Sequence, residues 1–324
     1  GCRRAGAAGV SQLLREPFTL VDGGLSTVLE EMGEHPAGLL WTAAALIDRP
    51  EVITAAHRRY LEAGADIIAP SGMVDGMEAG ADVIITASYQ ASEAGFVAAG
   101  LDAPAARRLL ALTTAVARAA EPAMVACSVG PFGACLGDGS EYHGHYQASW
   151  PEVRAFHRAR LQVLVDTAPD LFAIETMPSL VEAQIVVEEL RALTDAPAWV
   201  AFTCADATHT CSGDVFADAV AAVAPALAAV GLNCTAPGLV AQLLGSVSVD
   251  LPLVAYPNHG AQWSSEHRCW VGPTGGAEIP GLVPSWLAAG ARLIGGCCGV
   301  GTAGVAALAE LRRSGSFGPE RRMQ

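Results

Sequence analysis

Charged side chains are scarce in this chain. They make up 16% of its 324 residues, whereas hydrophobic residues make up 52%. A chain with so little charge and so much apolar material folds around a core, so we exclude an intrinsically disordered protein. The length fits one large barrel or two ordinary domains.

Basic residues are in the minority. The sequence has 19 basic against 33 acidic residues, a net charge of −14. A surface this acidic repels nucleic acid and anionic membranes, so we expect neither as a partner. The expected partners are small-molecule substrates, and the sequence carries no signal for an oligomeric state.

No apolar run is long enough to cross a bilayer. The longest nearly pure one, Ala219 to Leu232, is too short and is interrupted by Pro225. The apolar stretch near the N-terminus is too weak for a signal peptide. We therefore interpret residues 1–16 as an N-terminal arm and expect a cytoplasmic protein.

Closely paired cysteines of the Cys-x-x-Cys type are missing. The nine cysteines are an odd number in a chain of this size, which excludes a small disulfide scaffold. In a reducing compartment, cysteines are packing residues, metal ligands or nucleophiles.

What the sequence does contain is a regular alternation of short apolar runs and helical patterns. Most of the runs lack polar alternation, which is typical of strands buried on both faces. Helical patterns cover 50–64, 179–193 and 305–313. We expect a (β/α)8 TIM barrel over residues 17–313, because a doubly wound sheet would favour a Gly-x-Gly-x-x-Gly turn after a strand, and none is present. The eight predicted strands are 18–22, 82–88, 123–129, 171–176, 198–204, 228–234, 253–257 and 292–297.

The second strand has two competing starts. The sequence Glu-Ala-Gly-Ala-Asp occurs at 62–66 and again at 78–82. We assign the strand to the second copy, because the polar residues Ser88 and Tyr89 follow it. The piece at 67–77 is then an inserted loop or a surplus strand, and the Gly-, Ser- and Arg-rich segment 314–324 is interpreted as a disordered tail.

Unusual polar residues collect where the predicted strands end. In a (β/α)8 barrel the active site lies at the carboxyl ends of the strands, so this coincidence indicates an enzyme. Asp22 and Glu175 end the first and fourth strands, where they either hold a substrate ammonium group or serve as a turn residue and a structural acid. The Gly-rich stretch 128–142 lacks a P-loop lysine and is interpreted as a loop covering the substrate.

Three cysteines also stand at strand ends. Cys234 ends the sixth strand, and the adjacent pair Cys297 and Cys298 ends the eighth. Vicinal cysteines rarely pair with each other, and the flanking glycines allow both sulfurs to face one point. The three are either ligands of a tetrahedral zinc with one open position or buried packing residues, and spacing alone leaves both readings open.

A zinc ion held by three thiolates is suited to one chemistry. Hydrolytic zinc sites favour His and carboxylate ligands, which keep the metal acidic enough to ionise water. Three thiolates reduce that acidity, so such a site is better suited to binding a substrate thiol and keeping it nucleophilic. The pattern therefore favours alkyl transfer to sulfur. A redox protein that cycles a vicinal disulfide is the alternative.

Taken in order, these motifs resemble the homocysteine S-methyltransferases, close to the type that uses S-methylmethionine. The matching segments run from about Phe18 to Leu311. They include residues 21–30, 86–91, 128–134, 138–142, 175–176, 202–204, 231–235, 256–258 and 295–299.

This resemblance implies a specific function. The chain is expected to transfer a methyl group from S-methylmethionine or S-adenosylmethionine to L-homocysteine, giving methionine. The resemblance implies Zn²⁺ on Cys234, Cys297 and Cys298, the homocysteine amino group at Asp22 and Glu175, and a site role for Tyr89. The family has a single Ala-Gly-Ala-Asp before the second strand, so 67–82 is an insertion by this comparison. The alternatives are a betaine- or selenocysteine-type methyltransferase and a non-catalytic zinc- or thiol-binding relative.

Overall fold

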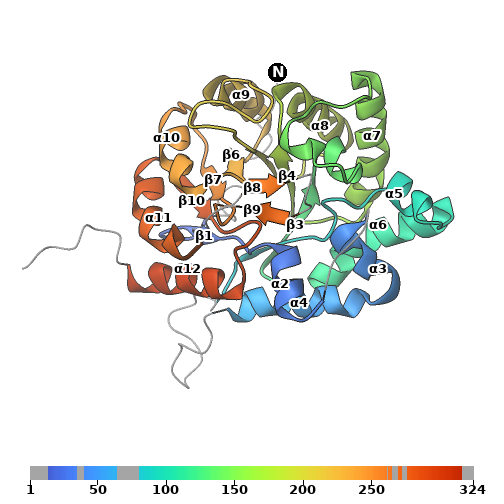
Figure 1. Cartoon of the computed structure of the whole chain (residues 1–324), viewed down its shortest axis with the longest axis horizontal. Coiled ribbons are helices and arrows are strands. Elements are labelled where there is room, and N and C mark those ends of the chain that lie inside the picture. Colours follow the sequence, from blue (N-terminus) through green and yellow to red (C-terminus); the bar gives the residue numbers. More distant parts are fainter. Residues whose placement is uncertain are drawn as a thin grey trace, which may run out of the picture.

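The chain folds into a barrel of eight parallel strands surrounded by helices (Figure 1). The computed structural model describes residues 14–34, 40–63, 80–260, 262–264, 269–271 and 276–315. The predicted arm up to residue 13, residues 67–79 of the predicted insertion and residues 316–324 of the predicted tail lie outside the described residues. No helix in the described ranges is long and apolar enough to cross a membrane.

All eight predicted strands are confirmed, apart from small differences at their ends. Neighbours in the sheet follow the chain order, and each pair is parallel. A parallel bridge between Val21 and Val83 joins the first strand to the second and closes the cylinder. The strands are β1 Thr19–Leu20, β2 Val83–Ile85, β3 Met124–Val129, β4 Leu171–Met177, β5 Ala198–Phe202, β6 Ala229–Asn233, β7 Leu253–Tyr256 and β10 Ala291–Ile294.

The helices form the outer ring (Figure 1). The predicted helices at 50–64, 179–193 and 305–313 correspond to α4, α8 and α12. Local signals set their starts: Ser149 and Glu152 form a capping box at α7, and the side chain of Asp102 caps α6. The helices are α2 Leu25–Glu31, α3 Ala45–Asp48, α4 Pro50–Glu62, α5 Glu93–Ala98, α6 Ala103–Arg118, α7 Trp150–Asp166, α8 Leu180–Leu193, α9 Phe216–Val223, α10 Val240–Gly245, α11 Ile279–Ala288 and α12 Thr302–Ser314.

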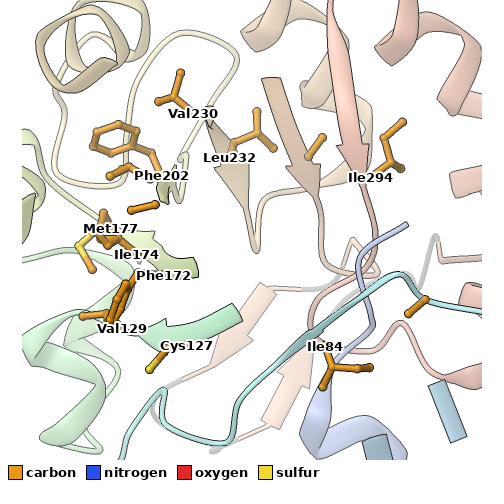
Figure 2. Packing of buried hydrophobic residues seen from close by; sticks show 14 of the residues in the cluster. Ile84, Cys127, Val129, Phe172, Ile174, Met177, Phe202, Val230, Leu232 and Ile294 are labelled. Carbon is orange, nitrogen blue, oxygen red and sulfur yellow. The ribbon is translucent and has the colours of Figure 1, made fainter. Parts of the chain in front are cut away.

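Most strands contribute to two separate cores, which explains the apolar runs without alternation. On β5, Val200 and Phe202 pack outward against the helices, whereas Trp199 and Ala201 point into the barrel. Figure 2 shows outward-facing residues of several strands, Phe202 among them. Because both faces are buried, the barrel is a solid scaffold that fixes the strand ends relative to one another.

One pair of strands was not predicted. Gln262–Ser264 (β8) and Cys269–Val271 (β9) form a two-stranded antiparallel sheet in the connection after β7. Strands of three residues are too short to give a periodic hydrophobic pattern, so the sequence did not reveal them.

Candidate functional site

A cavity of about 430 Å³ opens at the carboxyl ends of the strands. This volume is typical of small-molecule sites. Its wall includes residues at or just after the ends of β1, β2, β4, β6, β7 and β10 and residues of the loop that follows β3, and the acidic and sulfur-bearing candidates from the sequence all contribute to it. Asp22, Tyr89, Glu175, Cys234, Cys297 and Cys298 line it.

The sulfur atoms of the three cysteines converge on one point. The Sγ atoms of Cys234 and Cys298 are 3.8 Å apart, and those of Cys297 and Cys298 are 3.9 Å apart. All three lie within 4.8 Å of one another. Zinc–sulfur bonds of about 2.3 Å in a tetrahedron separate the sulfurs by about 3.8 Å. The cluster therefore fits a zinc ion.

The protonation of the three thiols also points to a cation. Hydrogen bonds with Cys297 and Cys298, together with burial, raise the pKa of the Cys234 thiol well above its usual value. Hydrogen bonds from Cys234 and Cys297 hold the pKa of the Cys298 thiol well below its usual value. The buried thiols therefore oppose one another's ionisation, and a positive ion between them would stabilise all three as thiolates.

Cys234 is positioned by an unusual backbone. Its φ angle is +46°, in the left-handed region that a non-glycine residue rarely adopts. Hydrogen bonds compensate for this conformation, because the Cys234 carbonyl accepts from Thr203 Oγ1 and from Asn258 Nδ2, both at 3.2 Å. The turn directs the thiol toward Cys298 as the chain leaves β6.

The pair on the last strand sits in a tight loop. The N–H of Cys297 donates to the Pro257 carbonyl at 2.8 Å, and the Cys298 carbonyl accepts from the N–H of His259 at 2.9 Å. Gly299 has a φ of +76°, and a Cβ there would approach the His259 ring to 2.2 Å. A side chain at this position would be strained and would collide with the ring, so the loop requires glycine here. The role of His259, which the sequence left unassigned, is to support the Cys298 backbone.

Asp22 and Glu175 are both buried in the cavity wall. Asp22 Oδ2 accepts from the N–H of Ile85 at 2.9 Å, and Glu175 Oε1 accepts from Ser128 Oγ at 2.5 Å. Burial raises the pKa of Asp22, and the nearby charge of Glu175 raises it further. Burial likewise raises the pKa of Glu175 to about 7. Two buried carboxyl groups that repel each other favour a bound cation.

Tyr89 lines the same cavity, and burial raises the pKa of its phenol well above the usual value, so the phenol is protonated. Its backbone is held by Arg160, a residue of α7 that the sequence did not single out. Arg160, only 2% exposed, donates to the carbonyls of Tyr89 at 2.7 Å and Gly130 at 3.0 Å. A charged residue on the helix face that also carries Leu161 and Leu164 was the signal available in the sequence.

The Gly-rich loop reaches the site as expected for a covering segment. Gly137, Gly139, Glu141 and Tyr142 all line the cavity. The side chains of His143 and His145 in the same loop are exposed and stack on each other with ring centroids 5.3 Å apart. These two histidines contribute nothing to the cysteine cluster.

Comparisons with known proteins agree with this geometry. A family model described as homocysteine S-methyltransferase matches residues 19–70 and 75–312. Homocysteine S-methyltransferase of Escherichia coli (strain K12) is 39% identical over 311 residues, covering 91% of this chain and 95% of that protein. Homocysteine S-methyltransferase 4 of Zea mays is 39% identical over 324 residues, covering 92% and 90% respectively.

A solved structure is similar as well. The crystal structure of the homocysteine methyltransferase MmuM from Escherichia coli in its metallated form superposes with a TM-score of 0.76 at 38% identity. The match covers 91% of this chain and 96% of that one. The residues matched by the family model include all eight strands of the barrel and the strand ends that carry the cavity. The chain belongs to the homocysteine S-methyltransferase family.

Proposed function

We propose that this protein transfers a methyl group from a sulfonium donor to the thiol of L-homocysteine, with zinc held by Cys234, Cys297 and Cys298. The observation that carries the proposal is the sulfur cluster, with spacings of 3.8 and 3.9 Å, at the mouth of a barrel of this family. The donor is S-methylmethionine or S-adenosylmethionine, and the product on the acceptor side is methionine.

The choice of metal follows from the donor set. Three sulfur ligands select zinc over the hard cations that prefer oxygen. Zinc bound by the three cysteines would keep the thiol of homocysteine deprotonated near neutral pH. A relative of known structure is described as metallated, which supports a metal at this position.

Asp22 and Glu175 are proposed to bind the ammonium group of homocysteine. Both carboxyl groups are buried in the cavity wall, where a charge-assisted hydrogen bond is stronger than in water. An ammonium group between them would compensate the burial and the smaller repulsion from Glu175 that raise the pKa of Asp22. The chain thereby fixes the orientation of the acceptor.

The remaining contribution of the protein is positioning. The homocysteine sulfur forms a bond to the methyl carbon while the bond from that carbon to the donor sulfur breaks, and the donor leaves as a neutral thioether. A neutral leaving group needs no proton, so no general acid is required. Tyr89, with its protonated phenol in the wall, is proposed to orient the substrates and exclude water.

The free thiols of the described cysteines fit a reducing compartment, so we propose the cytoplasm as the location. Homocysteine as the acceptor is supported by the family to which the chain belongs, and the donor is proposed from the chemistry of the site. Betaine as a donor and selenocysteine as an acceptor are the alternatives, and turnover with each of them is measured in parallel with the test below.

The test combines metal analysis with turnover. Wild type, Cys298→Ser and the control Cys211→Ser are purified, and zinc content and methionine formation from homocysteine and S-methylmethionine are measured. Cys211 lies outside the cluster and donates to Thr203 Oγ1 at 3.7 Å. We expect stoichiometric zinc and activity in wild type and control, and loss of both in Cys298→Ser. Undiminished turnover without zinc would rule out the proposal.

A further inference from the structure

A third carboxyl group in the cavity has no assigned role. Glu141 lies in a single 3-10 turn, Ser140–Tyr142 (η4), within the loop that follows β3. The residue is only 8% exposed, and it lines the cavity together with Tyr89 and Tyr142. Its Oε2 atom is buried and has no hydrogen-bond partner within the described part of the chain. A buried carboxylate oxygen without a partner is costly, which indicates that a ligand supplies the missing donor.

The turn holds this carboxyl group in place. The N–H of Ser140 donates to Asp138 Oδ1 at 2.9 Å, and the Ser140 carbonyl accepts from the N–H of Gly144 at 2.8 Å. Burial raises the pKa of Glu141 to about 7, and the charge of Asp138 adds to this effect. The loop therefore presents an acidic group that a bound cation would stabilise.

Glu141 belongs to a different part of the cavity from the acceptor site. Asp22 feels the charges of Glu175 and Cys297. Burial raises the pKa values of Tyr89 and Tyr142, and the charge of Glu141 raises both further, whereas the charge of Glu175 acts on Tyr89 as well. Glu141 stands on the loop after β3, Asp22 follows β1 and Glu175 lies in β4, so the wall carries Glu141 and the acceptor pair on separate elements.

The cavity as a whole is suited to positively charged ligands. Its described lining contains Asp22, Glu141 and Glu175 but no lysine, arginine or histidine. Both substrates of the proposed reaction are amino acids with an α-ammonium group, and the donor carries a sulfonium in addition. Asp22 and Glu175 are assigned to the ammonium group of the acceptor, so Glu141 is the carboxyl group of the described lining that is left for a cation of the donor.

We propose that Glu141 binds the α-ammonium group of the methyl donor, so that the cavity holds two amino acids on carboxyl groups from separate elements. This inference rests on the proposed function. An ammonium group offers N–H donors to the open Oε2 atom, whereas a sulfonium offers none. The ammonium also keeps its charge throughout methyl transfer, so Glu141 contributes to donor binding and not to the chemical step. Tyr89 and Tyr142 place aromatic rings beside the donor cation.

The experiment compares two donors on the zinc-loaded enzyme. S-Methylmethionine is one donor, and (3-carboxypropyl)dimethylsulfonium, which lacks only the amino group, is the other. The variants are Glu141→Gln, which preserves shape, and Glu310→Gln on the exposed face of α12 as the control. Steady-state kinetics give KM and kcat for each donor and for homocysteine. Calorimetric titration of S-methylmethionine without homocysteine gives a binding constant that does not depend on turnover.

For Glu141→Gln we expect KM and Kd for S-methylmethionine to rise about 10- to 100-fold, the value of a hydrogen bond to a charged group. The kcat, the KM for homocysteine and the KM for the donor without an amino group should change less than about threefold. An equal loss for both donors, a loss confined to homocysteine, or no loss at all would overturn the inference. If wild type binds S-methylmethionine through Glu141 but transfers no methyl group, the proposed function fails, whereas Glu141 as the binding site for the ammonium group of this ligand is retained.

Discussion

The side chain of Asn233, at the end of β6, is hydrogen-bonded to Thr176 near the end of β4, two strands away in the barrel. Asn233 Oδ1 accepts from the N–H of Thr176 at 2.7 Å, and Asn233 Nδ2 donates to Thr176 Oγ1 at 2.9 Å. Thr176 has a φ of +58° and follows Glu175, whereas Asn233 precedes Cys234, whose φ is +46°. One amide therefore joins the strained ends of β4 and β6 and links the proposed ammonium site to the proposed metal site.

Replacing this amide should weaken both stability and metal binding. We expect Asn233→Ala to lower the free energy of unfolding by about 2–3 kcal/mol, because two buried hydrogen bonds are lost beside strained backbone. Zinc affinity should fall about 10- to 100-fold, since Asn233 Nδ2 also lies 3.8 Å from Cys297 Sγ. Urea unfolding and titration with a competing chelator measure the two effects. The exposed Gln242→Ala is the control, and equal behaviour of the two variants would contradict this account.

Glu175→Gln should stabilise the metal-free protein at high pH. Burial raises the pKa of Glu175 to about 7 from 4.5, so the folded state binds a proton more tightly than the unfolded state. Wild type therefore loses stability as pH rises from about 4.5 to 7, by at most roughly 3 kcal/mol. Glutamine carries no such cost, and its carbonyl can still accept from Ser128. Urea unfolding should give a more stable variant at pH 8 and a small difference at pH 5.

Glu189→Gln is the matched control, and its expected effect on stability at pH 8 is opposite in sign to that of Glu175→Gln. Hydrogen bonds from Arg158 and Arg154 lower the pKa of Glu189. Glu189→Gln should therefore lower stability at pH 8, and that deficit should shrink as pH falls through the carboxyl range. If Glu175→Gln and Glu189→Gln changed the stability at pH 8 in the same direction, burial of the carboxylate charge would not be the cause of the effect at Glu175. Glu175→Gln should also raise the KM for homocysteine, so that stability and acceptor binding oppose each other at this residue.

Removal of the metal should stop turnover and expose thiols. A chelator is expected to abolish methionine formation, and added Zn²⁺ should restore it, because the proposed reaction needs the acceptor as a thiolate. Cys297 and Cys298 are half-buried at the cavity wall. A colorimetric thiol reagent should therefore react with more thiols in the metal-free protein than in the zinc-loaded protein. Identical thiol reactivity in the two forms would argue against metal binding at the cluster.

A buried ion pair fastens the last helix to the closing seam of the barrel. Arg312 on α12 pairs with Asp82, and Asp82 Oδ2 also accepts from the N–H of Leu20 at 2.7 Å. Both side chains are buried. Arg312→Met would leave the buried Asp82 carboxylate without its positively charged partner. We therefore expect a loss of about 3–5 kcal/mol in the free energy of unfolding.

The double variant Asp82→Asn with Arg312→Met tests the cause of that loss. It should recover much of the stability, since no buried charge remains. Urea unfolding of the two single variants and the double variant gives the coupling between the residues. Additive losses would mean that the two side chains stabilise the seam independently.

The sequence predicted the barrel well, because strands buried on both faces leave a strong signal. Apolar runs, such as 198–202 on β5, lie where the two cores of the barrel require them. The strand assignment beginning at Asp82 was correct because polar, site-like residues follow it. The cysteines were predicted for the same reason, since unusual residues at strand ends meet at one edge of a barrel.

Other features depend on contacts that a single sequence does not reveal. The positive φ values of Thr176 and Cys234 occur in residues with no preference for that conformation, and the hydrogen bonds that support them come from distant segments. In the sequence, Arg160 cannot be distinguished from the other arginines in helices, although its side chain donates a hydrogen bond to the Tyr89 carbonyl. The sequence indicated Glu141 only as part of a loop that covers the substrate. The burial of its Oε2 atom without a hydrogen-bond partner depends on the fold.

The first and last loops of the barrel are in backbone contact. The N–H of Gly24 donates to Val300 at 3.0 Å, the N–H of Gly296 donates to the Asp22 carbonyl at 3.0 Å, and a Cβ at Gly24 would approach the Cys297 carbonyl to 2.7 Å. Neither loop can shift without moving the other. An ion that orders the last loop would therefore preorganise Asp22, and an amino acid held by Asp22 would in turn slow the escape of the ion, since linkage between two ligands is reciprocal.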